Sequence, residues 1–410
     1  MSQKDKSILM IGCFDTKEEN FNFLRQCILS HGERVISMNT GIFGSTSLFP
    51  VELESDLVAA EAGESIEGLR KKADRGHAVE VMGKGAGKLV SRLLTEGKIK
   101  AVIGMGGGGG TYIALAAMEP LPIGFPKLCI STLATKDVSR QVGFKDIFLV
   151  PSIVDIAGLN KIISPIIMNA ASAICSMSNT ERIFQEKSLG VIAVSMFGNT
   201  TPCVNQATRI LEERGYETMV FHANGLGGKA MEDLIRENCF IGVLDITTTE
   251  LADELCGGIC SAGPDRLTAA SEMGIPQLVV PGCMDMVNFS HKDTVPVHFS
   301  SRQLYSWAPD VTLMRTNGDE NLKLGEIMAE KLNTSIAPVK VVLPLKGLSQ
   351  IDNEGGVFYN SEINRILFES IKNNLQANIK IEEVEMHIND FEFSELIANQ
   401  MIKLIELEKD

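Results

Sequence analysis

The stretch Ala101-Val-Ile-Gly-Met-Gly-Gly-Gly-Gly-Gly-Thr-Tyr-Ile-Ala-Leu-Ala-Ala-Met118 decides the fold of this chain. Its first residues form a short apolar, β-branched run, which is typical of a buried strand. Five glycines follow without a break, Gly106, Gly107, Gly108, Gly109 and Gly110, and Thr111 then opens an alanine-rich run with helical periodicity. The stretch therefore predicts a strand, a glycine loop and a helix in succession.

A glycine loop between a strand and a helix predicts an anion site. Free backbone N–H groups and the helix N-terminus converge there, and glycine lets the backbone approach a phosphate and supplies any positive φ that the loop needs. Thr111 is expected to cap the helix and to offer its hydroxyl to a phosphate or a metal. The loop has neither the Gly-Lys-Ser/Thr of a P-loop nor the spacing of a dinucleotide fingerprint. Tight packing of the helix on the strand is the alternative interpretation.

Length and composition predict a soluble protein of two domains. A chain of 410 residues exceeds one typical hydrophobic core, and 44% hydrophobic with 22% charged residues is an ordinary globular composition. The net charge of −14 argues against sequence-independent binding of nucleic acid, which requires basic residues that face phosphates.

The cysteines and the apolar runs predict a cytoplasmic location. Nine cysteines without CxxC spacing favour reduced thiols over a disulfide framework or a zinc site. Neither a signal peptide nor an apolar run long enough to span a bilayer is visible. We therefore expect no membrane partner.

The chain begins with a predicted βαβ unit: a strand over Ser7–Cys13, a helix over Lys17–His31 and a strand over Arg34–Asn39. The tripeptide Asp15-Thr16-Lys17 follows the first strand, on the edge where open parallel sheets hold ligands. A ligand contact is one interpretation of these residues. Capping of the helix by Asp15 or Thr16 is the other.

A second polar loop follows the strand predicted over Lys127–Ile130, on the same edge as the glycine loop. Its hydroxyls and its ammonium suit phosphate oxygens, and its carboxylate suits Mg²⁺ held through water. A polar turn with a cap is the alternative. The loop contributes Ser131, Thr132, Thr135, Lys136 and Asp137 as expected ligands of the nucleotide or anion.

The segment Gly83-Lys84-Gly85-Ala86-Gly87-Lys88 resembles a phosphate loop but lacks a preceding strand. Helical periodicity continues on both sides of it, from Ala78 to Glu96. We therefore predict a helix whose glycines let neighbouring helices approach closely.

The second half of the chain repeats the pattern of the first. A strand predicted over Val191–Phe197 leads to a helix that ends at Arg214-Gly215, as the first helix ends at His31-Gly32. We predict α/β domains over residues 1–180 and 189–390 with mostly parallel sheets and a weak internal duplication. The amphipathic stretch 391–410 is expected to pack back on the first domain.

Polar groups also leave the ends of several strands predicted in the second half, which predicts a second binding surface. His222 and Asp265 are the candidate catalytic residues there, because imidazole acts as acid or base near neutral pH; a structural role for His222 is the alternative. No metal-ligand set is expected. The candidate substrate-binding residues are Gly198, Asn199, Thr200, Thr201, Gly225, Gly227, Gly228, Thr247, Thr248 and Arg266.

These motifs, in this order, resemble one family over nearly the full length of the chain. It is the family of the ATP-binding N-terminal region of the tomato resistance protein against tomato mosaic virus, together with uncharacterised bacterial proteins. The matching segments include Asp15-Thr-Lys17, the glycine loop, Pro151–Asn160, Met196–Pro202, His222–Gly228, Ala262–Arg266 and Pro281–Phe289. One departure is Thr135-Lys136, where Ser-Gly is commoner.

The resemblance implies two Rossmann-like domains, ATP with Mg²⁺ and a homodimer or homotetramer, but no settled reaction. We expect an ATP-binding protein that acts as an enzyme on a small metabolite in the cleft between its domains. A regulatory or scaffold protein without turnover is the second hypothesis. The third is a hydrolase or lyase whose glycine loop holds a phosphorylated or carboxylate substrate.

Overall fold

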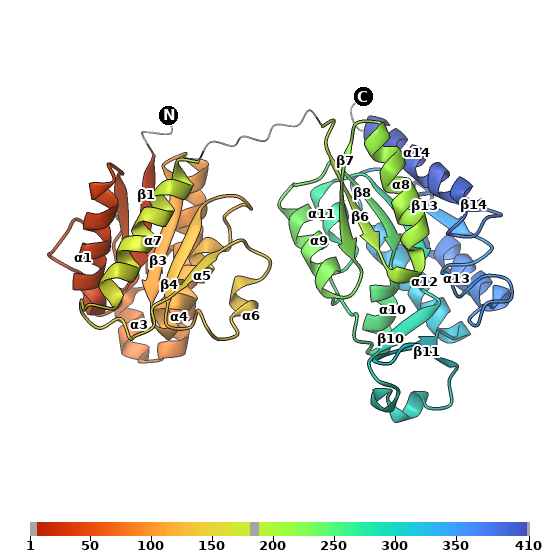
Figure 1. Cartoon of the computed structure of the whole chain (residues 1–410), viewed down its shortest axis with the longest axis horizontal. Coiled ribbons are helices and arrows are strands. Elements are labelled where there is room, and N and C mark those ends of the chain that lie inside the picture. Colours follow the sequence, from red (N-terminus) through yellow and green to blue (C-terminus); the bar gives the residue numbers. More distant parts are fainter. Residues whose placement is uncertain (1–5, 181–187, 408–410) are drawn as a thin grey trace. The chain divides into compact units, whose positions relative to one another are not determined.

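The computed structural model describes residues 6–180 and 188–407. These residues form two compact units, one on either side of residue 184, each with its own sheet (Figure 1). Residues 181–187, between the two predicted domains, lie outside the described residues.

The first unit contains a five-stranded parallel sheet in the order β2-β1-β3-β4-β5. This is one of the two common strand orders of doubly wound α/β domains. From β1 the chain adds β2 on one side and β3, β4 and β5 on the other, so the order switches sides between β1 and β3. The strands are β1 (Ser7–Gly12), β2 (Val35–Asn39), β3 (Ile99–Gly106), β4 (Lys127–Ser131) and β5 (Phe148–Pro151).

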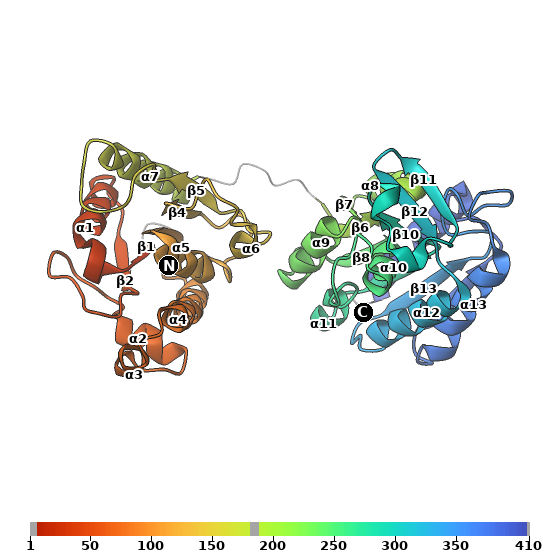
Figure 2. The ribbon, with the colours of Figure 1, turned by 90° about the horizontal axis from the view of Figure 1, so that it is seen from below.

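Helices cover both faces of the first sheet (Figures 1 and 2). Along β1, Ile8 and Met10 face the helices α1 (Phe14–Ser30) and α7 (Ile163–Ser178), because side chains alternate along a strand. Leu9 and Ile11 face the opposite layer. That layer consists of α2 (Ser55–Glu61), α3 (Ile66–Lys72), α4 (Arg75–Thr95) and α5 (Gly108–Met118).

The glycines of residues 83–88 lie inside α4, which confirms the predicted helix and its close packing. A Cβ on Gly85 would lie 1.9 Å from the carbonyl oxygen of Val58, and a Cβ on Gly83 would lie 3.1 Å from the Cβ of Ala116. Any side chain at Gly85 would therefore push α2 away from α4.

The second unit has a six-stranded parallel sheet in the order β14-β13-β9-β8-β6-β7. Read from its other end, the order is β7-β6-β8-β9-β13-β14. It places the second strand of the unit beside the first and the later strands in succession, as in the first unit, with one strand added. This agrees with the predicted duplication. The strands are β6 (Val191–Met196), β7 (Glu217–His222), β8 (Gly242–Thr247), β9 (Gln277–Gly282), β13 (Val339–Pro344) and β14 (Lys380–Val384).

The last helix, α14 (Phe391–Leu407), belongs to the second unit, so the prediction that it packs on the first domain is wrong. Phe393, Ile397 and Met401 are buried against the sheet beside α8 (Thr201–Glu213). The six-stranded sheet has a face that α8 alone does not cover, and α14 completes that layer. The opposite face carries α9 (Leu226–Arg236), α10 (Thr249–Cys256), α11 (Ala269–Met273), α12 (Gly318–Leu332) and α13 (Ser361–Asn374).

A small antiparallel sheet is inserted between β9 and α12. Its strands β10 (Met286–Phe289), β11 (Leu304–Ala308) and β12 (Val311–Arg315) pair in the order β10-β12-β11. This insertion was not predicted from the sequence.

All nine cysteines are free thiols. Burial raises the pKa of Cys129 and of Cys203 to about 12, so both stay protonated at neutral pH. Within residues 6–180 and 188–407, no helix combines the length and the apolar character that crossing a bilayer requires.

Candidate functional site

A cavity of about 740 Å³ opens in the first domain at the carboxyl ends of β1 and β3. This is the point where the strand order reverses, the position at which open α/β sheets hold ligands. Its floor is the loop Gly106–Gly110, and we call it the glycine cavity.

The five glycines of the floor differ in what requires them. A Cβ on Gly106 would lie 2.7 Å from the Cα of Gly110, so the backbone of the turn itself excludes a side chain there. A Cβ on Gly107 would meet only the Thr132 hydroxyl at 3.8 Å, and a Cβ on Gly108 would meet no atom within 4 Å. None of these five glycines has a positive φ, so the expectation of left-handed positions in the loop is wrong. Neither packing nor backbone conformation therefore requires glycine at 107 and 108.

This difference gives a testable pair of variants. Gly106→Ala is expected to lower the free energy of unfolding by about 1–3 kcal/mol, because the added methyl group overlaps the backbone of Gly110. Gly107→Ala is expected to stay within about 0.5 kcal/mol of the parent protein. Urea unfolding of both variants measures the effect, and equal losses in the two would contradict the assignment.

The start of α5 supplies backbone donors to the cavity. Gly107 is the N-cap and α5 begins at Gly108, so the first amides of this helix have no carbonyl partner inside it. Thr111 lies further along the helix, and its hydroxyl is buried. This hydroxyl donates to the Gly106 carbonyl at 3.1 Å and also shares a hydrogen bond of 2.6 Å with the Ser131 hydroxyl. The expectation that Thr111 caps the helix and presents its hydroxyl to a ligand is therefore wrong. Thr111 and Ser131 instead fasten α5 to β4 below the loop.

Three cations line the glycine cavity, and sequence analysis anticipated only Lys17. The Lys17 ammonium donates to the Ile156 carbonyl, and the Arg70 guanidinium donates to the Ile42 carbonyl. Arg75 is exposed and, within the part of the chain that the structure describes, has no hydrogen-bond or ion-pair partner. One nitrogen of its guanidinium lies 4.0 Å from the position of a Cβ on Gly109. Arg75 was missed because it begins a helix far from the loop in sequence.

Three carboxylates, Asp15, Asp74 and Asp155, also line the cavity. Asp15 Oδ2 accepts the Phe43 amide at 3.0 Å, whereas its buried Oδ1 has no partner among the described residues. The start of α1 is held by Asn39 from β2, whose Oδ1 accepts the Phe14 amide at 3.2 Å. The alternative that Asp15 or Thr16 caps α1 is therefore wrong, since Cys13 is the N-cap.

The predicted ligands from the tripeptide after β1 and from the second polar loop are not all brought together. Thr16 and Thr132 line the glycine cavity, and Thr135 lines a smaller neighbouring pocket. Lys136 and Asp137 are exposed and line neither space. Asp137 Oδ1 accepts the Ser139 amide at 3.0 Å at the start of α6 (Ser139–Val142), as in the alternative of a capped turn. Its expected role in holding Mg²⁺ does not fit this position.

The remaining wall of the glycine cavity is apolar. It is formed by side chains from the loop after β2, from α3, from α4 and from α5: Ile42, Leu69, Val79, Met82 and Ile113. The cavity thus has one wall of backbone donors and cations and a second, apolar wall against which a planar ring can pack.

The second glycine turn differs from the first because a side chain of the protein occupies its donors. Glu250 Oε1 accepts the amides of Gly225 at 2.7 Å and Gly228 at 3.2 Å, and Gly227 donates to Asn224. An anionic substrate would have to displace the Glu250 carboxylate. The prediction that these glycines bind substrate therefore does not fit the geometry.

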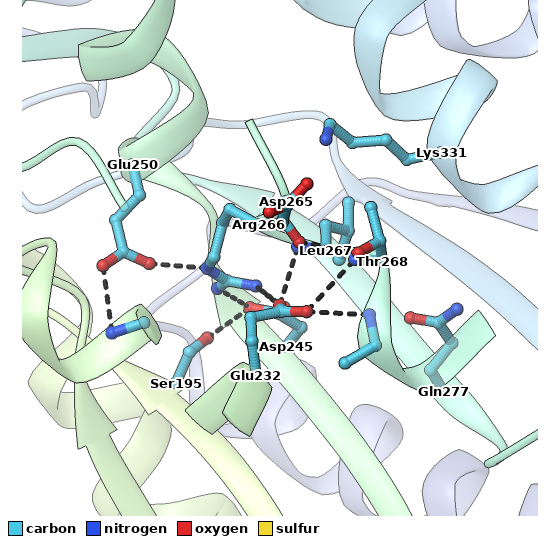
Figure 3. Close-up of polar contacts among 12 residues, drawn as sticks. Ser195, Glu232, Asp245, Glu250, Asp265, Arg266, Leu267, Thr268, Gln277 and Lys331 are labelled. Carbon is cyan, nitrogen blue, oxygen red and sulfur yellow. Dashed lines mark hydrogen bonds and ion pairs between the residues drawn. The ribbon is translucent and has the colours of Figure 1, made fainter. Parts of the chain in front are cut away.

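Arg266, a predicted substrate ligand, is fully buried in an ion network (Figure 3). Its guanidinium donates to both oxygens of Asp245 at 2.6 and 2.7 Å and to Glu250 at 2.6 Å, and it pairs with Glu232 at 3.2 Å. Ser195 donates to Asp245 at 2.6 Å. Burial raises the pKa of Glu232, although Arg266 lowers it. The prediction for Arg266 is corrected: this residue holds α9, β8 and α10 together and has no contact with solvent.

The predicted polar groups at the ends of β6 and β8 are also bonded internally. Thr200 and Thr247 share a hydrogen bond of 2.7 Å, and Thr248 donates to the Val280 carbonyl at 3.3 Å. Thr201 donates to the Phe197 carbonyl. Asn199 is buried, whereas Gly198 is exposed. The second domain's cavity of about 560 Å³ runs along α14, and none of the predicted substrate residues lines it.

The two candidate catalytic residues are exposed and lie on different elements: His222 is the last residue of β7, and Asp265 lies in the loop between α10 and α11. The His222 ring stacks on Phe197 with centroids 5.3 Å apart. The Asp265 carboxylate lies beside the Arg266 network and makes no bond with the residues drawn in Figure 3. Their catalytic roles stay predictions.

A buried carboxyl group next to this network predicts a pH dependence of stability. Burial raises the pKa of Asp253 to about 7, against hydrogen bonds from Asn288 and the Cys260 amide that lower it. An unfolded Asp releases its proton near pH 4, at a pKa of about 3.9, so between that pH and 7 the folded chain binds more protons. The free energy of unfolding is therefore expected to fall as the pH rises through this window.

Asp253→Asn is expected to flatten this pH dependence. The Asn288 amide has an unpartnered Oδ1, and rotation of that amide gives a new amide at position 253 an acceptor. Urea unfolding at pH 5 and pH 7.5 compares the variant with the parent protein. Identical slopes would mean that Asp253 is ionised in the folded state.

Fold and site together define a protein of two doubly wound α/β domains, the first with a glycine-floored cavity at its switch point. The chain belongs to the uncharacterised protein family UPF0261. Residues 6–182 match its N-terminal domain and residues 190–405 its C-terminal domain.

Relatives of the same family occur in bacteria and plants. The chain is 45% identical to a UPF0261 protein of Clostridium tetani over 98% of this chain and 100% of that protein. It is 36% identical to the ToMV resistance protein Tm-1(GCR237) of Solanum lycopersicum over 97% of this chain, which spans 55% of the tomato protein. These findings confirm the resemblance that the sequence indicated.

Likeness to solved structures is low. The structure described as "S. aureus MnaA-UDP co-structure" has 9% identity and a TM-score of 0.24, over 99% of this chain and 98% of that chain. No argument about a ligand follows from it.

Proposed function

We propose that the glycine cavity binds ATP with Mg²⁺ and that the protein is an enzyme that uses this nucleotide on a small metabolite. The observation that supports the proposal best is the open space above Gly107 and Gly108, where neither packing nor φ requires glycine. A ligand that rests on the backbone gives a reason for their missing side chains.

The floor of the cavity suits phosphate groups. Backbone amides at the start of a helix donate to phosphate oxygens, and the helix dipole favours negative charge there. The guanidinium of Arg75 adds a fixed positive charge over the same loop.

The other walls suit the rest of the nucleotide and its cation. Ile42, Leu69 and Val79 offer an apolar surface to a base. The unpartnered Oδ1 of Asp15 is an oxygen ligand that Mg²⁺ accepts directly or through water, and a bound cation would neutralise phosphate charge. The proposal therefore places Mg²⁺ next to Asp15.

Two other functions are alternatives to this proposal. A regulatory protein that binds ATP without turnover is favoured by the internal bonding of most candidate groups in the second domain. A hydrolase or lyase is favoured if the glycine loop holds a phosphorylated or carboxylate substrate in place of ATP. We also infer a cytoplasmic homodimer or homotetramer, whose size light scattering measures.

Thermal unfolding with ATP, GTP, NAD, sugar phosphates and carboxylates, each with and without Mg²⁺, tests the proposal. ATP at 100 times its dissociation constant is expected to add about 2.7 kcal/mol to stability, less when Mg²⁺ is chelated. A shift with a sugar phosphate and none with ATP would overturn the nucleotide assignment. Release of ADP in the presence of a metabolite extract then separates the enzyme from the regulator.

Replacement of Arg75 is expected to weaken this binding. Arg75→Met removes a charge-assisted hydrogen bond, which corresponds to an affinity for ATP about 10- to 100-fold lower. Arg92→Met is the matched control on the same helix, because Arg92 pairs with Glu61 and does not line the cavity. Calorimetric titration measures both, and an equal change in the two variants would remove Arg75 from the site.

A further inference from the structure

A second, smaller space adjoins the glycine cavity and shares two of its residues. It has a volume of about 410 Å³ and lies at the carboxyl ends of β4 and β5. Thr132 and Asp155 line both spaces, so each stands at the junction between them. We call the smaller space the hydroxyl pocket.

The hydroxyl pocket offers polar groups that the fold does not use. The hydroxyls of Thr132 and Thr135 have no partner within the described residues. Asp155 Oδ1 accepts the Ile156 amide at 2.8 Å, which leaves Oδ2 for a ligand. Ser131 and Ser152 are different, because their hydroxyls are bonded internally.

An apolar residue in a strained conformation borders the pocket. Ile153 has a φ of 62°, which a β-branched residue rarely adopts, and its side chain is 73% exposed. Its side chain gains little from burial, so local packing does not explain the strain. Strained residues of this kind cluster at ligand sites.

We propose that the hydroxyl pocket binds a small uncharged sugar or polyol as the second ligand of the first domain. A carboxylate and two hydroxyls accept and donate hydrogen bonds to vicinal O–H groups, and Ile153 covers the carbon face of such a molecule. The Asp155 carboxylate disfavours a second anion beside it. The metabolite thus binds next to the phosphate floor, and not at the second-domain edge that the sequence indicated.

This inference rests on the proposed nucleotide site for its partner ligand but has its own test. The probe is D-xylose, observed by saturation-transfer NMR on the full chain, with and without the β,γ-imido analogue of ATP and Mg²⁺. Xylose is expected to receive saturation in both conditions, because the two ligands occupy adjoining spaces.

Thr135 lines the hydroxyl pocket and not the glycine cavity, so Thr135→Trp is expected to fill the hydroxyl pocket alone. It is expected to abolish the xylose signal and to leave the thermal shift by the ATP analogue unchanged. Gln141→Trp is the matched control, since Gln141 is exposed on the following helix and lines neither space. If Thr135→Trp does not fold, Thr135→Val removes only the hydroxyl and is expected to weaken xylose binding about fivefold or more.

Three outcomes would overturn the inference: no xylose signal in the parent protein, a full signal in Thr135→Trp, or displacement of xylose by the ATP analogue. Displacement would assign the hydroxyl pocket to the nucleotide itself. A xylose signal that depends on Thr135, without any thermal shift by the ATP analogue, would refute the nucleotide proposal and support the pocket.

Discussion

Arg266→Met is expected to lower the free energy of unfolding by about 3–5 kcal/mol at pH 7.5. Methionine fills a similar volume but leaves the carboxylates of Glu232, Asp245 and Glu250 buried without a positive partner. Breaking a buried ion pair on one side costs this much because an uncompensated charge stays in a low dielectric. Urea unfolding followed by circular dichroism measures the loss.

Arg209→Met is the control for this experiment. Arg209 forms an exposed pair with Glu213 at 2.9 Å, and such pairs contribute about 0.3–0.5 kcal/mol. Arg266→Lys is expected to recover only part of the loss, since an ammonium cannot make the forked contacts to Asp245 and Glu250 together. A loss below about 1 kcal/mol in Arg266→Met would mean that the acids are neutral in the folded protein.

Gly108→Val is expected to abolish the stabilisation of the protein by ATP while the fold stays intact. Gly108 is the first residue of α5, and no atom lies within 4 Å of the position of its Cβ. The valine side chain therefore enters the glycine cavity and takes the place of the phosphate. The shift of about 2.7 kcal/mol expected at 100 times the dissociation constant would disappear.

Gly318→Val is the matched control, because Gly318 is likewise the first residue of a helix, α12. Its Cβ would lie 3.1 Å from the flexible end of Ile366, which is half-exposed and can move. Unchanged ATP affinity in a folded Gly108→Val variant would remove the glycine loop from the nucleotide site. Loss of affinity in both variants would indicate a general effect on stability.

Local sequence patterns were sufficient to predict β3, α4 and α5. The apolar run before Gly106 and the periodicity after Thr111 predict β3 and α5 because both signals arise from neighbouring residues. The helix through residues 83–88 was predicted for the same reason. The position of the candidate site followed from the rule that ligands bind at the carboxyl ends of parallel strands.

Contacts between distant residues were not predictable in this way. Arg75 reaches the glycine loop from α4, and Glu250 reaches Gly225 from α10, although nothing near either residue in sequence indicates its partner. A polar residue at a strand end gives the same sequence pattern whether its side chain binds a ligand or another part of the protein. Arg266 was assigned to a substrate for that reason.

The inserted sheet was not predicted, and the packing surface of the last helix was predicted wrongly, for a related reason. The strands β10 to β12 are only 4 or 5 residues long and carry mixed patterns, so their local sequence gives no clear strand signal. The apolar stripe of α14 shows that the helix needs a partner surface, but the stripe does not identify the sheet that supplies it.

The separate sheets of the two units have a consequence for synthesis on the ribosome. All strands of the first sheet lie between residues 7 and 151, and all strands of the second parallel sheet lie between residues 191 and 384. Each hydrophobic core can therefore close from a continuous segment, without waiting for residues that the other half supplies. The first domain is thus free to fold while the second is still being translated, which shortens the time that its strand edges are exposed to aggregation.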